Sequence, residues 1–371
     1  MSRGLFFYTD AFQGYDMGPQ HPMRPIRLRK TFELLDSYGA FGSVELREPH
    51  PCPVDVLERT HRHDFIQAVD YLSSGQHFPY SYQRYGFGTG DNPVFPGLFE
   101  SSLLYTGASL DCASAIVEGE ATVAMNIAGG LHHAHRARAA GFCVFNDCAV
   151  ALRRLRDRFE RVAYVDIDVH HGDGVQELFY DDPSVLTVSI HETGRMLFPG
   201  AGFVAEIGEG AGRGYSVNVP VWPGTNDLLW LEAWDAVAMP ILRAYKPEAV
   251  VLQLGADAHA LDPLAHLLLT AQGWLEAVKD VQSLGVPIVA IGGGGYNMTT
   301  VPRMWTLAAS TLFGLDLPDA TPESYAWHDE IPRLADEAIF EPDEASLSEA
   351  KRYIDRVVAE AGTTLFPYHN L

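Results

Sequence analysis

The chain has 371 residues, of which 47% are hydrophobic, so it can bury a large core and is not expected to be disordered. Acidic residues outnumber basic residues by 48 to 26, and the formal net charge of −22 argues against binding to the phosphate backbone of a nucleic acid. No apolar run approaches the roughly 20 residues needed to cross a bilayer, and no secretory leader is recognisable. We therefore expect a cytoplasmic protein without membrane contact.

The N-terminal third of the chain shows no clear strand pattern. The first 120 residues are expected to form helices and loops that cover a sheet, with one amphipathic helix over residues 55–72. A long loop rich in glycine, proline and aromatic residues follows at 80–97. Loops of this length often carry function.

Beyond this region, apolar β-branched segments alternate with helix-like segments. Strands buried on both faces are predicted over residues 122–127, 161–168, 185–190, 215–221, 248–255 and 286–293. Helices are predicted between them over residues 146–159 and 226–245. The alternation predicts an α/β fold, with a mostly parallel central sheet and helices on both of its faces.

The last fifty residues differ in composition from the rest. After about residue 320 the chain becomes acidic and contains several prolines, and it then offers a final amphipathic helix over residues 346–362. We expect residues 320–371 to form a helical extension packed on a main body of about residues 5–310. Residues 1–371 would then form a single domain.

Polar side chains follow four of the predicted strands at the point where each strand ends. They are His132, His133, Asp166, Asp168, His170, Asp173, Asp257 and Tyr296. In an open parallel sheet, ligands bind outside the carboxyl ends of the strands. The sequence therefore predicts that these groups converge on one rim of the sheet.

The segment "YVDIDVHH" favours a metal site. Asp166, Asp168 and His170 are spaced by two residues, so in an extended strand they point to the same side. Buried carboxylates are costly unless a cation or hydrogen bonds compensate them. We predict Asp168, His170 and Asp257 as ligands of a catalytic metal, which needs about three protein ligands and an open position. His259 is expected instead to make a hydrogen bond at the start of a helix.

Several longer motifs carry a family resemblance. They are "HPMRPIRLRKTFELL", "GGLHHAH", "GFCVFND", "YVDIDVHHGDGVQE", "VSIHE", "LFPGAG", "LQLGADAHALDPLAHL" and "GGGGYN". In this order, over about residues 5–310, they resemble the metal-dependent histone deacetylase family, including its bacterial acetoin-utilisation and acetylpolyamine-amidohydrolase relatives. The phrase "DAHALDPLAHLLLT" is similar to the acetoin-utilisation branch, and "HPMRPIR" resembles class I enzymes. The resemblance implies the arginase/deacetylase fold.

The resemblance also implies an activity and a cofactor. The activity is removal of acetyl groups from the ε-amine of acetyl-lysine in proteins, with acetyl-CoA synthetase as one substrate in the acetoin-utilisation branch. The implied metal is Zn²⁺, on the same three ligands. Because the ligand set is rich in oxygen, Fe²⁺, Co²⁺ and Mn²⁺ are also admissible.

Further residue roles come from the resemblance alone. The implied catalytic residues are His132, His133, Asp166, Asp173 and Tyr296. The implied substrate-binding residues are Asp91, Gly141, Phe142, Phe198, Leu264 and Gly294. An inner K⁺ site is implied at Asp166, Asp168, His170, Ser189 and Ile190, and an outer one at Phe179, Asp182, Val185 and Tyr215. Arg27 matches an arginine that lines an internal channel for departing acetate.

Three alternatives to a protein deacetylase stay open at this stage. The first is hydrolysis of acetylpolyamines, which an acidic surface would suit. The second is a ureohydrolase-like enzyme with two manganese ions, and the third is a catalytically silent acetyl-lysine binder. The sequence also leaves open the oligomeric state, the acyl-chain preference, and which of His132 and His133 is the general base.

Overall fold

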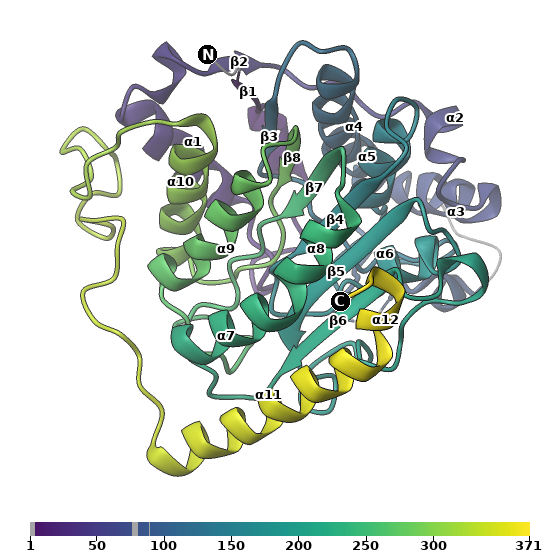
Figure 1. Ribbon diagram of the computed structural model, residues 1–371. Coiled ribbons are helices and arrows are strands. Elements are labelled where there is room, and N and C mark those ends of the chain that lie inside the picture. The colour runs from purple at the N-terminus through teal and green to yellow at the C-terminus, as the bar shows by residue number, and fades with distance from the viewer. Residues whose placement is uncertain (1–3, 76–80, 89) are drawn as a thin grey trace.

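One eight-stranded sheet organises the protein. The computed structural model describes residues 4–75, 81–88 and 90–371; Tyr80, at the start of the predicted loop 80–97, and Thr89 within it lie outside this part. The strand order is β2-β1-β3-β8-β7-β4-β5-β6, and all adjacent strands run parallel (Figure 1). The predicted α/β class with a parallel sheet is confirmed.

All six predicted strands are present. They are β3 (Val123–Asn126), β4 (Val162–Asp166), β5 (Val185–Glu192), β6 (Ser216–Val221), β7 (Ala249–Gln253) and β8 (Ile288–Ile291). Every residue of these strands is buried, which agrees with their apolar, β-branched sequences. Helices on both faces account for this burial.

The expectation that the first 120 residues contain no strand is wrong. β1 (Gly4–Phe7) pairs with β3 and with β2 (Glu45–Arg47), so that both extend the sheet at one edge. β1 spans four residues, and all three residues of β2 are at least partly exposed. Such short segments give too little periodicity to be recognised as strands.

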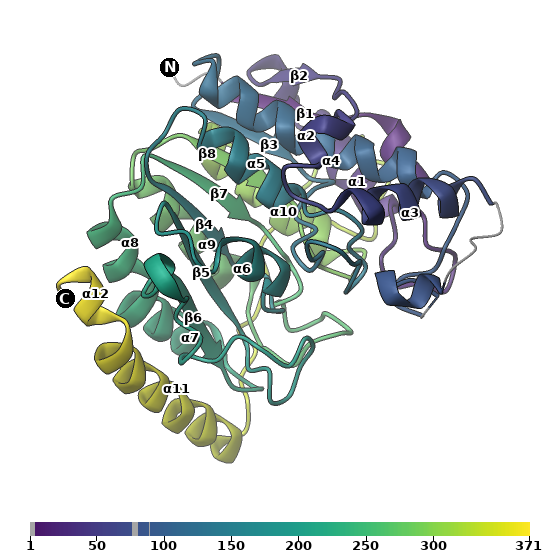
Figure 2. The ribbon, with the colours of Figure 1, turned by 90° about the vertical axis from the view of Figure 1, so that its right-hand side faces the viewer.

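Two layers of helices enclose the sheet. In one layer α9 (Ala271–Ser283) packs on α10 (Thr300–Phe313) and α7 (Asp227–Ala233), and α10 packs on α1 (Ile26–Ser37). In the other layer α4 (Leu98–Val117) packs on α5 (Asp147–Leu155) (Figure 2). The other α-helices before the C-terminal segment are α2 (Val54–Leu57), α3 (His63–Ser73), α6 (Asp173–Phe179) and α8 (Met239–Tyr245).

The predicted helix over residues 55–72 is divided into α2 and α3. His61 lies in the intervening turn and is buried there, with its ring nitrogens bonded to the carbonyl of His135 and the amide of Asn146. The amide of Arg62 donates to the carbonyl of Arg136. These bonds to a distant segment replace helical ones, which local periodicity could not indicate. The predicted helix 226–245 is continuous, but a π-helical turn at Trp234–Ala238 joins α7 to α8.

The C-terminal segment crosses the molecule before it ends. After α10 it runs along the outside to α11 (Glu344–Thr364) and α12 (Phe366–His369), drawn in yellow in Figure 1. α11 packs on β6 and α7, and the hydroxyl of Tyr353 lies 2.7 Å from that of Thr193, just after β5. Within the described residues, no helix has both the length and the apolar character needed to cross a bilayer.

A stability measurement tests whether α11 belongs to the same cooperative unit as the sheet. Ile354 of α11 is fully buried, and its replacement by alanine should cost about 2–5 kcal/mol. We expect one thermal transition, with a lower midpoint in the Ile354→Ala variant. The same truncation at Ile339, which is 64% exposed, should leave the midpoint almost unchanged. A separate transition for α11 would contradict the single-domain prediction.

Candidate metal centre and pocket

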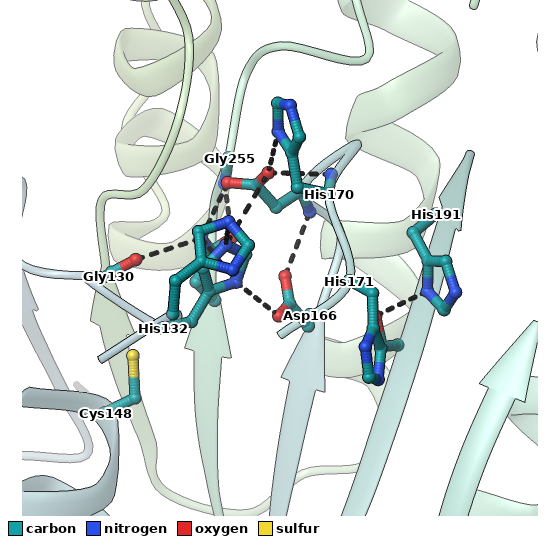
Figure 3. A network of polar contacts seen from close by, with 12 residues as sticks. Gly130, His132, Cys148, Asp166, His170, His171, His191 and Gly255 are labelled. Atoms are coloured by element: carbon teal, nitrogen blue, oxygen red, sulfur yellow. Dashed lines mark hydrogen bonds and ion pairs between the residues drawn. The ribbon is translucent and has the colours of Figure 1, made fainter. Parts of the chain in front are cut away.

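The four central strands, β3, β8, β7 and β4, bring the predicted polar groups together at their carboxyl ends. His132 and His133 follow β3, Tyr296 follows β8, and Asp257 follows β7. Asp166 is the last residue of β4, and Asp168 and His170 come directly after it. Figure 3 shows His132, Asp166 and His170 side by side where these strands end. Convergence on one rim therefore follows from the strand order.

Asp168, His170 and Asp257 form a compact buried group. One potential ligand atom from each lies within 4.8 Å of those of the other two. The Nδ1 of His170 is 3.2 Å from a carboxylate oxygen of Asp168 and 3.1 Å from one of Asp257. The other oxygen of Asp257 accepts from the amide of Val169. Two carboxylates and an imidazole thus face one point.

The electrostatics of this group fit a divalent cation. Burial, followed by repulsion from Asp168, raises the pKa of Asp257 to about 7. Burial opposes a charge on His170, but hydrogen bonds to the two carboxylates outweigh it and raise the pKa of His170 to about 10. The two carboxylates therefore demand a nearby positive charge, which a cation held by the three side chains supplies in place of the His170 proton.

Each of the tandem histidines is paired with its own aspartate. The Nδ1 of His132 lies 2.7 Å from Asp166, and the Nδ1 of His133 lies 2.7 Å from Asp173, the first residue of α6. The two Nε2 atoms are 3.0 Å apart. Burial raises the pKa of Asp166, and the hydrogen bond that it accepts from the hydroxyl of Tyr164 opposes this shift; it also accepts from the amide of Asp168.

This geometry fixes the number of protons on the two rings. Each Nδ1 must donate to its carboxylate, and the contact between the Nε2 atoms needs one further proton, so the pair carries one positive charge. Burial opposes charge on His132, but Asp166 and Asp168 raise its pKa to about 9. Burial and the charge on His132 lower the pKa of His133 to about 4. Of the two rings, His132 therefore holds the shared positive charge more readily than His133.

A pocket of about 210 Å³ opens above these groups. Its lining contains Asp91, His133, Gly141, Phe142, His170, Leu197, Phe198, Leu264 and Tyr296. The ring of Phe198 meets that of His133 edge to face at 4.9 Å, and Phe142 meets Tyr296 in the same way at 5.6 Å. The lining is thus mostly apolar, and Asp91, His133, His170 and Tyr296 supply its polar groups.

Close packing explains the glycines around the pocket. A Cβ at Gly294 would lie 2.0 Å from a carboxylate oxygen of Asp257, and the amide of Gly294 donates to Asp168 over 2.8 Å. At Gly141 a Cβ would lie 2.4 Å from the ring of His133, and φ is +50°. A side chain at Gly294 would displace Asp257, and one at Gly141 would displace His133.

Hydrogen bonds hold the backbone at Gly295 and Tyr296. The amide of Tyr296 donates to Asp262 over 2.7 Å, and the carbonyl of Gly295 accepts from Arg27 over 2.9 Å. Arg27 is buried, lies over the ring of Trp305, and lines a separate cavity of about 20 Å³. The structure therefore places Arg27 behind Tyr296 rather than in the main pocket.

The residues predicted for K⁺ binding fall in two places. Ser189 and Ile190 lie on β5. Ser189 is the register partner of Asp166, the last residue of β4, which Asp168 and His170 follow. The outer set, Phe179, Asp182, Val185 and Tyr215, lies around the start of β5, away from the pocket.

Several residues that support the site were not predicted from the sequence. Gln253 donates to Asp168 over 2.8 Å, and the buried carboxylate of Asp147 accepts from the amides of Gly130 and Leu131, just before the histidines. Asp173 is shared with His135, whose Nε2 lies 3.3 Å away. Carboxylate and amide groups inside the apolar segments "VVLQLG" and "FCVFNDC" were the available signal.

A further pair joins two walls of the pocket. The buried carboxylate of Glu192, at the end of β5, accepts from the amide of His266 and lies 2.8 Å from its Nδ1. Phe198 follows Glu192 in the chain, and Leu264 precedes His266. The pair therefore ties together the two loops that carry these wall residues.

A parallel sheet with a buried Asp-His-Asp group and two His-Asp pairs beside it suits a metal-dependent hydrolase. A model of the histone deacetylase domain matches residues 21–312. The chain therefore belongs to the histone deacetylase family.

Individual relatives agree with this assignment. The acetoin utilization protein AcuC of Bacillus subtilis (strain 168) is 39% identical over 341 residues, which cover 90% of this chain and 88% of that protein. Histone deacetylase 9 of Arabidopsis thaliana is 38% identical over 321 residues, covering 86% and 75% of the two chains. Histone deacetylase 1 of Homo sapiens is 38% identical over 322 residues, covering 86% and 67%.

Loss of one ligand should empty the metal site. We expect the His170→Ala variant, after dialysis against metal-free buffer, to retain little of the divalent metal that the wild type keeps, because two carboxylates alone hold it weakly. Elemental analysis of the purified variants measures this directly. The control is His63→Ala, since the His63 side chain is 65% exposed and remote from the group. Full occupancy in the His170 variant would refute its assignment as a ligand.

Proposed function

We propose that the protein is a metal-dependent deacetylase that hydrolyses the side-chain amide of acetyl-lysine in proteins or peptides, releasing acetate and the free lysine. The observation that carries this proposal is the pocket itself. Apolar walls from Phe142, Phe198 and Leu264 suit the aliphatic part of an acyl-lysine side chain, while His133, His170 and Tyr296 line the same pocket.

The residues of the site would have distinct roles in the reaction. Asp168, His170 and Asp257 would hold the metal, for which Zn²⁺ is our first choice and Fe²⁺, Co²⁺ and Mn²⁺ are alternatives. When bound there, such an ion polarises a carbonyl group and lowers the pKa of water. The contact between Glu192 and His266 joins two loops of the pocket wall and would act on the shape of the pocket.

His133 is our candidate for the general base. It lines the pocket and its pKa is lowered to about 4, so once its contact with the Nε2 of His132 opens, its own Nε2 can accept a proton from an attacking water. The bond from its Nδ1 to Asp173 stabilises the imidazolium that results. The same proton can then pass to the departing amine. His132, held by Asp166, contributes a fixed positive charge.

Tyr296 is our candidate for stabilising the transition state. Burial, together with the charges of Asp257 and Asp168, raises the pKa of Tyr296 well above its usual value, so that the hydroxyl stays protonated. A protonated hydroxyl at the wall of the pocket can donate to the acetyl oxygen as negative charge develops there.

The entrance favours a peptide over a polyamine. Phe198, Met196 and Leu261 are 44%, 54% and 49% exposed, and they lie on or next to the loops that carry the pocket walls. Asp91 is the carboxylate of the pocket lining and could bind the backbone amides of a substrate. A polycation would instead be recognised by several carboxylates around the opening. Acetyl-CoA synthetase, the protein substrate that the family resemblance implies, remains one candidate.

The remaining roles are proposals that rest on the family alone. They are K⁺ binding at the inner and outer sets of residues, and passage of acetate through the cavity beside Arg27. We also treat residues 1–371 as a single catalytic domain, and the protein as one that acts in the cytoplasm without binding nucleic acid or membrane.

A substrate comparison tests the proposed function. The chelated protein is reconstituted separately with Zn²⁺, Fe²⁺ and Mn²⁺ and assayed for amine release from an acetyl-lysine peptide and from an acetylated polyamine. We expect turnover of the peptide with at least one metal, and much slower turnover of the polyamine. Turnover of the polyamine alone would identify a small-molecule deacetylase, and no turnover of either compound would contradict deacetylase activity.

Removal of one hydroxyl tests the role of Tyr296. We expect Tyr296→Phe to lower kcat by about 10²–10³-fold, the usual cost of losing one donor to a developing oxyanion. The metal content should not change, because Tyr296 is not among the ligands. Tyr38→Phe is the matched control, since the Tyr38 hydroxyl bonds to the distant carbonyls of Pro318 and Ala320. Wild-type kcat in Tyr296→Phe would remove this tyrosine from the mechanism.

A further inference from the structure

Asp336, in the connection between α10 and α11, reaches the loop that follows β7. One carboxylate oxygen lies 3.0 Å from the Nε2 of His259 and accepts from the amide of Ala271 over 2.7 Å. The other oxygen accepts from Arg303 over 2.5 Å. The side chains of His259 and Asp336 are 0% and 7% exposed. Phe340 adds an edge-to-face contact with the His259 ring at 5.6 Å.

The backbone fixes the orientation of His259. Its Nδ1 accepts a hydrogen bond from the amide of Leu261 over 3.1 Å, so the ring proton must be on Nε2, which donates to Asp336. The expected bond at a helix start is therefore wrong: His259 stabilises a tight turn and links that turn to Asp336. The turn also contains a bond from the amide of Asp262 to the carbonyl of His259.

The same turn positions two pocket residues. One oxygen of Asp262 accepts from the amide of Tyr296 over 2.7 Å, and the other accepts from the amide of Leu264 over 2.9 Å. The side-chain amide of Asn297 donates to the carbonyl of Leu261 over 2.9 Å. A continuous series of hydrogen bonds thus runs from Asp336 through His259 and Asp262 to the backbone of Tyr296.

We propose that Asp336 is a positioning residue for catalysis, which acts through His259 and Asp262 to hold the Tyr296 hydroxyl at the pocket. This inference rests on the proposed deacetylase function and gives the C-terminal segment a part in the reaction. Loss of Asp336 leaves the buried Nε2–H of His259 without its acceptor, so that the turn must rearrange to satisfy it. Displacement of a catalytic group by about 1 Å can cost about a hundredfold in rate.

A double-mutant cycle separates positioning from general destabilisation. We compare kcat on the acetyl-lysine peptide for the wild type, Asp336→Ala, Tyr296→Phe and the double variant. We expect Asp336→Ala to lower kcat about tenfold or more in the wild type, but less than about twofold when Tyr296 is already phenylalanine. Asp336→Asn keeps an oxygen that can accept from His259 and should recover part of the rate. It also serves in the cycle if the alanine variant does not fold.

The control is Asp319→Ala. Asp319 anchors the same connection through Arg333 and the amide of Ala335, but it does not contact His259. We expect it to lower the melting temperature slightly and to leave kcat unchanged.

Three results would overturn the inference. Multiplicative losses in the double variant would show that Asp336 acts independently of Tyr296. Loss of metal from Asp336→Ala would show that it acts on Asp257 instead. An equal fall in kcat for Asp319→Ala would indicate a merely structural role. A wild type that hydrolyses no acetyl-lysine peptide would instead contradict the proposed function on which the inference rests.

Discussion

Repulsion between two carboxylates dominates the centre of this protein. Asp168 and Asp257 are almost fully buried and lie on either side of His170. Uncompensated charges in such a place are very costly. The surrounding groups reduce that cost with donors: the amides of Val169 and Gly294 and the side chain of Gln253. These donors stabilise negative charge without neutralising it, so the site retains its demand for a cation.

Buried carboxylates also set the protonation of the histidine pair. Asp166 and Asp173 fix both rings through Nδ1, which leaves the two Nε2 atoms to share one proton. Asp166 and Asp168 both raise the pKa of His132, whereas burial and the charge on His132 lower that of His133, so the shared proton is favoured on His132. The same buried carboxylates therefore favour a cation at one point and a proton on one of the two imidazoles.

Local patterns were sufficient for some features and not for others. Six buried strands and the polar groups at their ends could be predicted, because each is encoded by a few adjacent residues. β1, β2 and the turn at His61 could not, since they depend on short segments or on bonds to distant parts of the chain. The contact between His259 and Asp336 joins residues 77 positions apart, and no local periodicity reports it.

The order of strands in space differs from their order along the chain, and this has a consequence for synthesis. β7 and β8 are the last strands to be made, yet they occupy the middle of the sheet, between β3 and β4. A growing chain that ends before β7 leaves the edges of β3 and β4 unpaired and apolar. Such a chain holds the histidines and two of the proposed metal ligands, Asp168 and His170, but lacks Asp257 and Tyr296. The proposed catalytic centre can thus be completed only after the chain as far as Tyr296, of 371 residues, has left the ribosome.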